Sequence, residues 1–186
     1  SIQLNHGGTE MGQGLFIKVA QVVAQELQVD IDQIEITATH TGKVPNTSAT
    51  AASSGSDLNG MAAMNAARTI RRRLTAFASN HYGVPETEIA FYSGRIQIGA
   101  RKVSFSDLVM EAYLNRVQLS ATGFYRTPKI HWDPITATGR PFYYFAYGAA
   151  VTEVAIDLLT GENRVIAVDI LHDVGRSLNP AVDKGQ

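Results

Sequence analysis

The chain has 186 residues, of which 45% are hydrophobic and 18% are charged, a composition typical of a globular domain. Its 16 Lys and Arg residues balance 17 Asp and Glu residues, so no charge excess predicts binding to nucleic acid or to an anionic membrane. Cysteine is absent, which excludes disulfides, zinc–thiolate sites and cysteine-ligated iron–sulfur clusters within this chain, and no apolar run approaches the length of a membrane span.

The first third of the sequence predicts strand, helix and strand. Residues 2–5 form a short strand, and residues 6–13 a glycine-rich loop. A helix over residues 14–29 follows, because its apolar residues recur at helical spacing: Leu15, Val19, Val22, Val23 and Leu27. Residues 34–37 form the next strand and lead into a loop of small residues, 39–56.

A second helix is predicted over residues 57–79, with Ser56 or Asp57 as its cap and with Gly83 and Pro85 ending it. Its buried side is marked by Ala63, Ala66, Ile70, Leu74 and Phe77. A hairpin around Ser93 and Gly94 over residues 88–103 and a short helix over 107–115 follow. Mixed strands and helices without regular βαβ alternation favour an α+β fold with helices packed on a mixed β-sheet.

The last third is richer in strand. Residues 128–139 are expected to form a loop, and residues 142–157 and 164–171 a long hairpin that turns at Thr160 and Gly161. Asn179 and Pro180 are suited to the first positions of a new helix. Because both termini interrupt an element, we expect residues 1–186 to be part of one domain of a larger polypeptide.

The loop His6–Gly14 (HGGTEMGQG) is the first candidate binding site. Its glycines allow close approach of a ligand to the backbone, and a helix N-terminus follows directly, where unpaired N–H groups favour an anion. Gln13 adds an amide that both donates and accepts hydrogen bonds. The loop matches neither the Walker pattern nor GxGxxG, so a plain strand-to-helix turn remains an equal alternative.

Residues 44–56 (VPNTSATAASSGS) are the second candidate, again placed before a helix. Their small, hydroxylated side chains and backbone amides suit a phosphate or the edge of a pterin, and the alternative is a Ser/Thr/Ala loop that only caps the helix. Other candidates are weaker. The five histidines show no metal-ligand spacing, Glu10 and Asp173 are acid/base candidates or caps, and Arg71–Arg73 favour a solvated helix face.

Several segments resemble, in order, the molybdopterin-binding domain of the xanthine dehydrogenase family. These are GGTEMGQG ending at Gly14, VPNTSATAAS ending at Ser53, SATGFYRTP ending at Pro128, Phe142–Gly148, and DVGRSLNP ending at Pro180. The resemblance covers essentially the whole chain. It implies a two-layer molybdopterin-binding domain and an oxidoreductase that hydroxylates purines of the hypoxanthine or xanthine type with oxygen from water.

The resemblance also implies cofactors and residue roles. Gly12, Gln13 and Gln186 would contact the pterin, and Thr50, Ala51, Ala52 and Ser53 would line the cofactor, with the backbone of Ala52 near the molybdenum. The metal would be held by the pterin dithiolene. Electrons would pass to 2Fe-2S clusters and FAD on other domains or subunits of a cytoplasmic, oligomeric enzyme.

No catalytic residue is expected within the chain, because the family's glutamate base and its substrate-orienting residues lie outside it. Position 55 is glycine where some members have serine, so one hydroxyl contact is missing. We therefore expect the 186 residues alone to be inactive. Two alternatives remain: a non-catalytic module that binds a nucleotide or phosphate, and a related hydroxylase of aldehydes, carbon monoxide or other heterocycles.

Overall fold

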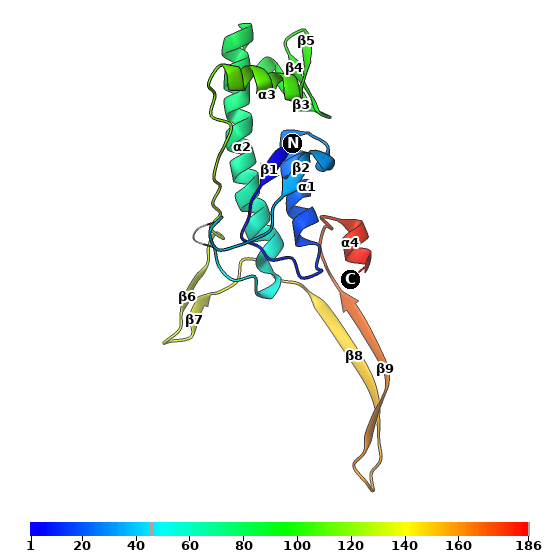
Figure 1. Cartoon of the computed structure of the whole chain (residues 1–186). Coiled ribbons are helices and arrows are strands. Elements are labelled where there is room, and N and C mark those ends of the chain that lie inside the picture. Colours follow the sequence, from blue (N-terminus) through cyan, green and yellow to red (C-terminus); the bar gives the residue numbers. More distant parts are fainter. Residues whose placement is uncertain (45–46, 186) are drawn as a thin grey trace. The chain divides into compact units, whose positions relative to one another are not determined.

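The computed structural model describes residues 1–44 and 47–185 (Figure 1). Two compact units, Ser1–Arg126 and Thr127–Gly185, are described separately. Helices alternate with small sheets of two or three strands, which confirms the predicted α+β class. In the described part of the chain the strands form several small sheets, and no single sheet spans both units.

The first unit begins with a βαβ motif. Strands β1 (Ile2–Leu4) and β2 (Ile34–Ile36) pair in parallel, and helix α1 (Leu15–Leu27) connects them. A short 3-10 turn, η1 (Ile31–Gln33), precedes β2. Helix α1 starts after Gly14, whose φ of 73° lies in the left-handed region that glycine adopts without strain. The predicted strand, helix and strand are therefore confirmed.

Helix α2 (Gly55–Tyr82) is longer than predicted at both ends and follows a 3-10 turn, η2 (Ala52–Ser54). The predicted caps Ser56 and Asp57 are wrong, because both residues lie inside the first turn of α2. Ser54 occupies the N-cap position and makes no side-chain hydrogen bond to the helix. Gly83 ends the helix as predicted, with a φ of 69°.

The predicted hairpin over 88–103 is a three-stranded meander. A 3-10 turn, η3 (Glu86–Glu88), leads into antiparallel strands β3 (Ile89–Tyr92), β4 (Arg95–Ile98) and β5 (Arg101–Ser104). The hairpin prediction missed a second turn at Gly99, where φ is 55°. Helix α3 (Phe105–Leu114) follows, and the Ser104 hydroxyl caps it by accepting a hydrogen bond from the Asp107 amide.

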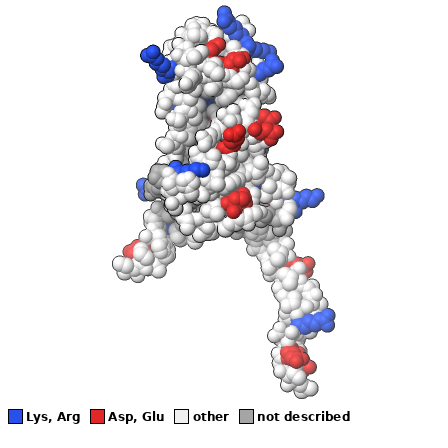
Figure 2. All heavy atoms as spheres, viewed as in Figure 1, with Lys and Arg blue, Asp and Glu red and all other residues white. Residues whose placement is uncertain are grey.

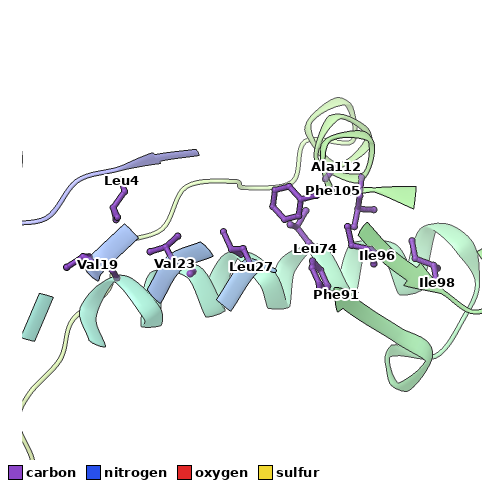
Figure 3. Packing of buried hydrophobic residues seen from close by; sticks show 14 of the residues in the cluster. Leu4, Val19, Val23, Leu27, Leu74, Phe91, Ile96, Ile98, Phe105 and Ala112 are labelled. Atoms are coloured by element: carbon purple, nitrogen blue, oxygen red, sulfur yellow. The ribbon is translucent and has the colours of Figure 1, made fainter. Parts of the chain in front are cut away.

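The hydrophobic core of this unit joins α1, α2, α3 and the meander (Figure 3). Four of the five residues in the predicted α1 stripe are buried, and Val22 is half-buried. On α2 the predicted Ala63 and Leu74 are buried, and Ile70 and Phe77 are partly buried and pack against the core. Ala67 and Ala78 are buried as well, whereas the predicted Ala66 is partly exposed. The central buried side chains are Leu15, Val19, Leu27, Leu74, Ile96, Ile98 and Leu108.

Residues 117–124, here called the strap, run along α2 after helix α3. The Arg73 guanidinium donates to the carbonyl oxygens of Gln118 and Ser120, and the Asn65 amide donates to that of Phe124. A Cβ at Gly123 would lie 1.9 Å from the Ala62 carbonyl oxygen, so only glycine allows this approach. The strap is therefore held by contacts with its main chain.

The arginine run Arg71–Arg73 is not the solvated face that the sequence predicted. Arg71 donates to the carbonyl oxygen of Glu26 and lies over the ring of Phe91 at 5.0 Å, and Arg73 binds the strap. Of the three, Arg72 is exposed.

The second unit contains two antiparallel hairpins. Strands β6 (His131–Asp133) and β7 (Thr138–Arg140) form where a loop was predicted, with a turn stabilised by the Asp133 carboxylate. Strands β8 (Gly148–Ile156) and β9 (Asn163–His172) form the predicted long hairpin, although β8 begins later than residue 142. None of the described residues of this unit is buried.

Helix α4 (Pro180–Gly185) ends the described chain. The Asn179 side-chain oxygen accepts a hydrogen bond from the Val182 amide at 3.2 Å, so the predicted cap is confirmed. On the face drawn in Figure 2, basic and acidic side chains are interspersed. None of the helices among the described residues is both long and apolar enough to cross a membrane.

Candidate functional site

The two candidate loops lie together in the first unit. The amide of Thr9 donates to the Thr50 hydroxyl oxygen at 2.8 Å, which joins loops 41 positions apart in the sequence. A Cβ at Gly7 would lie 2.1 Å from the Thr47 hydroxyl oxygen, and a Cβ at Gly8 would lie 2.5 Å from Leu15. These two glycines therefore allow the first loop to pack against the second loop and against α1.

Glu10 caps helix α1 from within the first loop. One carboxylate oxygen accepts hydrogen bonds from the amides of Gly12 and Gly14 at 2.9 and 3.0 Å, and the other accepts from Phe16 at 2.9 Å. Desolvation opposes ionisation, but these backbone N–H groups outweigh it and hold the pKa of Glu10 below its usual value. The prediction that the α1 N-terminus is open to an external anion is therefore wrong.

Gln13 is also fixed inside the first loop. Its side-chain oxygen accepts from the Met11 amide at 2.6 Å, and its side-chain nitrogen donates to the Thr9 carbonyl oxygen at 2.9 Å. Gly12, with a φ of 98°, is exposed at the tip, and an added Cβ there would meet nothing within 4 Å. The loop is thus ordered by its own side chains, and Gly12 leaves space for a ligand against the backbone.

In the second loop, unlike the first, no described loop side chain caps the helix that follows. Ala51, Ala52 and Ser53 are exposed just before α2, and Thr50 is half-buried by its contact with the first loop. Ala52 has a φ of 56°, a strained conformation for a residue with a side chain. Ser54 provides no side-chain cap for this 28-residue helix, and Asp57 places a carboxylate in its first turn.

His6 is the first residue of the first loop, and no role for it was predicted from the sequence. It is 7% exposed, accepts a hydrogen bond from the Gly8 amide at its Nδ1 atom, and packs edge-to-face on Phe16. Burial lowers its pKa, opposed by the Asn59 side chain and the charge of Glu10. The available signal in the sequence was a histidine directly before two glycines. This pattern does not by itself predict that the histidine is buried; the structure shows it.

The remaining predicted positions are not in this site. Gln186 lies outside the described residues. Asp173, in the second unit, accepts from the Gly175 amide at 2.7 Å and therefore organises a turn. Within residues 1–44 and 47–185, no cluster of three or more His, Asp or Glu side chains could hold a metal ion.

A groove of about 540 Å³ runs beside α2 in the first unit, and none of its lining residues belongs to either loop. Its arginines Arg68 and Arg71 both approach Glu26, at 3.1 and 3.5 Å, so one carboxylate offsets part of the positive charge of two guanidinium groups.

The comparisons with known proteins identify the family of the chain. A family model described as the molybdopterin cofactor-binding domain matches residues 1–186. The chain is 47% identical to xanthine dehydrogenase/oxidase of Mus musculus and 45% identical to xanthine dehydrogenase of Oryza sativa subsp. japonica, in both cases over all of this chain and 12% of the relative. It is 42% identical to nicotinate hydroxylase of Emericella nidulans, over all of this chain and 13% of that protein.

Solved structures of low sequence identity share the fold. A Cu,Mo-containing CO dehydrogenase matches with a TM-score of 0.75 and 22% identity, over 98% of this chain and 22% of that one. Quinoline 2-oxidoreductase from Pseudomonas putida 86 matches with a TM-score of 0.71 and 21% identity, over 98% of this chain and 23% of that one. The chain thus spans about an eighth of its curated relatives and under a quarter of these structures.

Proposed function

The chain belongs to the molybdopterin cofactor-binding domain family, and we propose that it forms part of the cofactor site of a hydroxylase acting on purines of the hypoxanthine or xanthine type. The substrate class is supported by the 45–47% identity to xanthine dehydrogenases of animals and plants. The whole enzyme would include further domains or subunits with 2Fe-2S clusters and FAD.

One observation supports the site most directly: the two loops meet through Thr9 and Thr50, beside the small, exposed residues that precede α2. We propose that the exposed backbone of Ala51, Ala52 and Ser53, together with Thr50, binds an anionic part of the cofactor there. Gly12 and Gln13 would contact its pterin from the first loop, as would Gln186. Small side chains and a positive φ at Ala52 allow close approach to the main chain, so these residues fit the group.

When bound, molybdopterin would supply the metal and the redox chemistry, and the backbone of Ala52 would lie near the molybdenum. This chain would bind and orient the cofactor. It would contribute no general base: the Glu10 carboxylate is committed to backbone amides, and His6 is buried beneath the loop surface, where its Nδ1 atom accepts from the Gly8 amide. The proton transfers would belong to residues of the longer polypeptide.

The test is made in the longer polypeptide that contains this chain. Ala52→Asp should reduce the bound molybdenum and pterin at least tenfold, since Asp tolerates a positive φ but repels an anion. Ala52→Asn has the same shape without the charge and should retain most of the cofactor. Ala100→Asp, in an exposed turn, is the matched control. Equal cofactor content in all variants would refute this site.

The substrate is tested with the same polypeptide. Xanthine hydroxylation with ¹⁸O from labelled water is expected, and the 186-residue chain alone should show none. Nicotinate is the second candidate substrate, because a nicotinate hydroxylase is 42% identical to the chain. Turnover of nicotinate without turnover of xanthine would favour that candidate. A tight nucleotide complex of the isolated chain, seen by calorimetry, would instead support a non-catalytic module.

A further inference from the structure

The groove beside α2 carries more positive than negative charge. Three arginines line it, Arg68, Arg71 and Arg72, against the two carboxylates of Glu26 and Glu86. The Glu26 side chain is 16% exposed, whereas those of Arg68 and Arg71 are 51% and 35% exposed. The shared carboxylate is therefore covered more than the guanidinium groups that it binds, and the groove presents positive charge to solvent.

Arg68 and Arg72 are the two arginines that can bind a ligand. Arg71 is committed to the fold, because it donates to the Glu26 carbonyl oxygen at 3.0 Å. Arg68 is oriented by the hydrogen bond from its Nε atom to Glu26 at 3.1 Å, and the exposed Arg72 donates from one terminal nitrogen to the Thr69 hydroxyl oxygen at 3.3 Å. Because a guanidinium group has several N–H donors, both arginines keep donors for a carboxylate after these contacts within the described chain.

The spacing of these two arginines selects the form of the ligand. Arg68 and Arg72 lie one turn apart on α2, where Cβ atoms are about 6 Å apart. In an extended peptide, side chains two positions apart project from the same side at a spacing of about 7 Å, whereas adjacent side chains project from opposite sides. Two acidic residues separated by one residue would therefore reach both arginines together.

The length of the groove also suits an extended segment. Its α2 residues run from Asn65 to Thr75, about 15 Å along the helix axis, which is the length of about five extended residues. Phe124 of the strap lines the groove and is 69% exposed, so it offers an apolar contact to a residue beside the acidic pair. Glu86 is exposed and would repel a further acidic residue.

We propose that this groove is a docking site for a partner protein, and that it binds an extended segment with two acidic residues separated by one residue. The charge complementarity lies in Arg68 and Arg72, which can each form a bidentate pair with a carboxylate. The inference does not rest on the cofactor site, because no residue that lines the groove belongs to either candidate loop.

The probe is a fluorescent peptide capped at both ends, Ser-Gly-Glu-Val-Glu-Gly-Ser, added to the longer polypeptide that contains this chain at low ionic strength. Fluorescence anisotropy should report binding. The peptide Ser-Gly-Val-Glu-Glu-Gly-Ser, with adjacent acidic residues, should bind about fivefold more weakly, because only one carboxylate at a time can face the arginines. A peptide with Gln in place of both Glu residues should not bind.

Variants of the protein locate the site. Arg72→Gln removes an exposed side chain and should weaken binding about tenfold, since hydrogen bonds between two charged groups are lost. Arg95→Gln, at an exposed arginine of β4, is the matched control and should leave the affinity unchanged. Glu86→Gln should strengthen binding about twofold, because it removes a repelling charge. The molybdopterin content of Arg72→Gln should equal that of the wild type, which separates this proposal from the proposed function.

The proposal would be overturned by absence of binding, by equal affinities of Arg72→Gln and Arg95→Gln, or by equal affinities of the spaced and adjacent peptides. Displacement of the peptide by an equal concentration of inorganic phosphate would show a site for small anions instead. Binding to the 186-residue chain but not to the longer polypeptide would show that the groove is covered within that polypeptide, which would overturn docking of a partner.

Discussion

The units Ser1–Arg126 and Thr127–Gly185 contain equally regular secondary structure, but their stabilisation differs. The first unit buries side chains from helices and strands in one hydrophobic cluster. The second has hairpins whose apolar residues, such as Leu158 and Leu171, are 94% and 78% exposed. An isolated two-stranded hairpin is marginally stable in water. Backbone pairing alone therefore defines the shape of the second unit, whereas packing stabilises the first.

The largest expected difference in the free energy of unfolding comes from truncating one leucine in each unit. Leu74→Ala removes a side chain that is 0% exposed and should lower the free energy of unfolding by about 2–5 kcal/mol, because it leaves a cavity in the core. Leu171→Ala should change it by less than about 0.5 kcal/mol. Urea denaturation followed by circular dichroism measures both. Equal losses would show that the second unit has a buried core of its own.

The next comparison replaces one glycine by alanine in each unit. Gly123→Ala places a Cβ against the Ala62 carbonyl oxygen and should cost about 1–3 kcal/mol, since both atoms belong to rigid backbone. Gly185→Ala, in α4 of the second unit, meets nothing within 4 Å and has no such penalty. Thermal unfolding of the two variants should separate them, and a stable Gly123→Ala would contradict the close approach of the strap.

A smaller effect is expected at the link between α2 and α3. The Tyr82 hydroxyl donates to the Glu111 carboxylate, and desolvation together with this carboxylate raises the pKa of Tyr82 to about 12. Tyr82→Phe should destabilise the first unit by about 1–2 kcal/mol. Tyr147→Phe, whose side chain is exposed in the second unit, should have no measurable effect. Chemical denaturation near neutral pH is the measurement.

The smallest expected effect is a dependence of the free energy of unfolding on pH. Burial lowers the pKa of His6, so the unfolded chain binds the proton more readily than the folded chain. The stability contributed by neutral His6 is complete above about pH 6.5 and is lost as the pH falls through its lower pKa in the folded state. Glu10 adds a loss of the same sign at more acidic pH. His6→Asn should flatten the denaturation midpoint between about pH 5 and 7, while His131→Asn should not.

Much of the first unit could be predicted from the sequence, because its helices have apolar periodicity and clear end signals. Gly83 ends α2 as expected, and Asn179 caps α4 in the second unit. The start of α2 was misplaced because several Ser residues compete as caps and the strained Ala52 leaves no local signal. Strands β6 and β7 were missed because their turn depends on the Asp133 side chain.

The candidate site was only partly predictable. Motif order identified both loops, and the structure places them in contact through Thr9 and Thr50. What sequence reasoning could not decide was that Glu10 caps α1. Glu10 is separated from Phe16 by five residues, and its role depends on the left-handed turns at Gly12 and Gly14 that bring those amides to one carboxylate.

The strap has a consequence for how its sequence can diverge. Arg73 and Asn65 recognise carbonyl oxygens, which every residue carries, so the identity of Gln118, Ser120 or Phe124 is not read by these contacts. These contacts depend instead on the identity of Arg73 and Asn65 in α2 and on the absence of a side chain at Gly123. A saturation-mutagenesis profile of this stretch should therefore show tolerance at Gln118, Ser120 and Phe124 and intolerance at Gly123, while Val117 and Leu119, which pack against the core, should accept only apolar side chains.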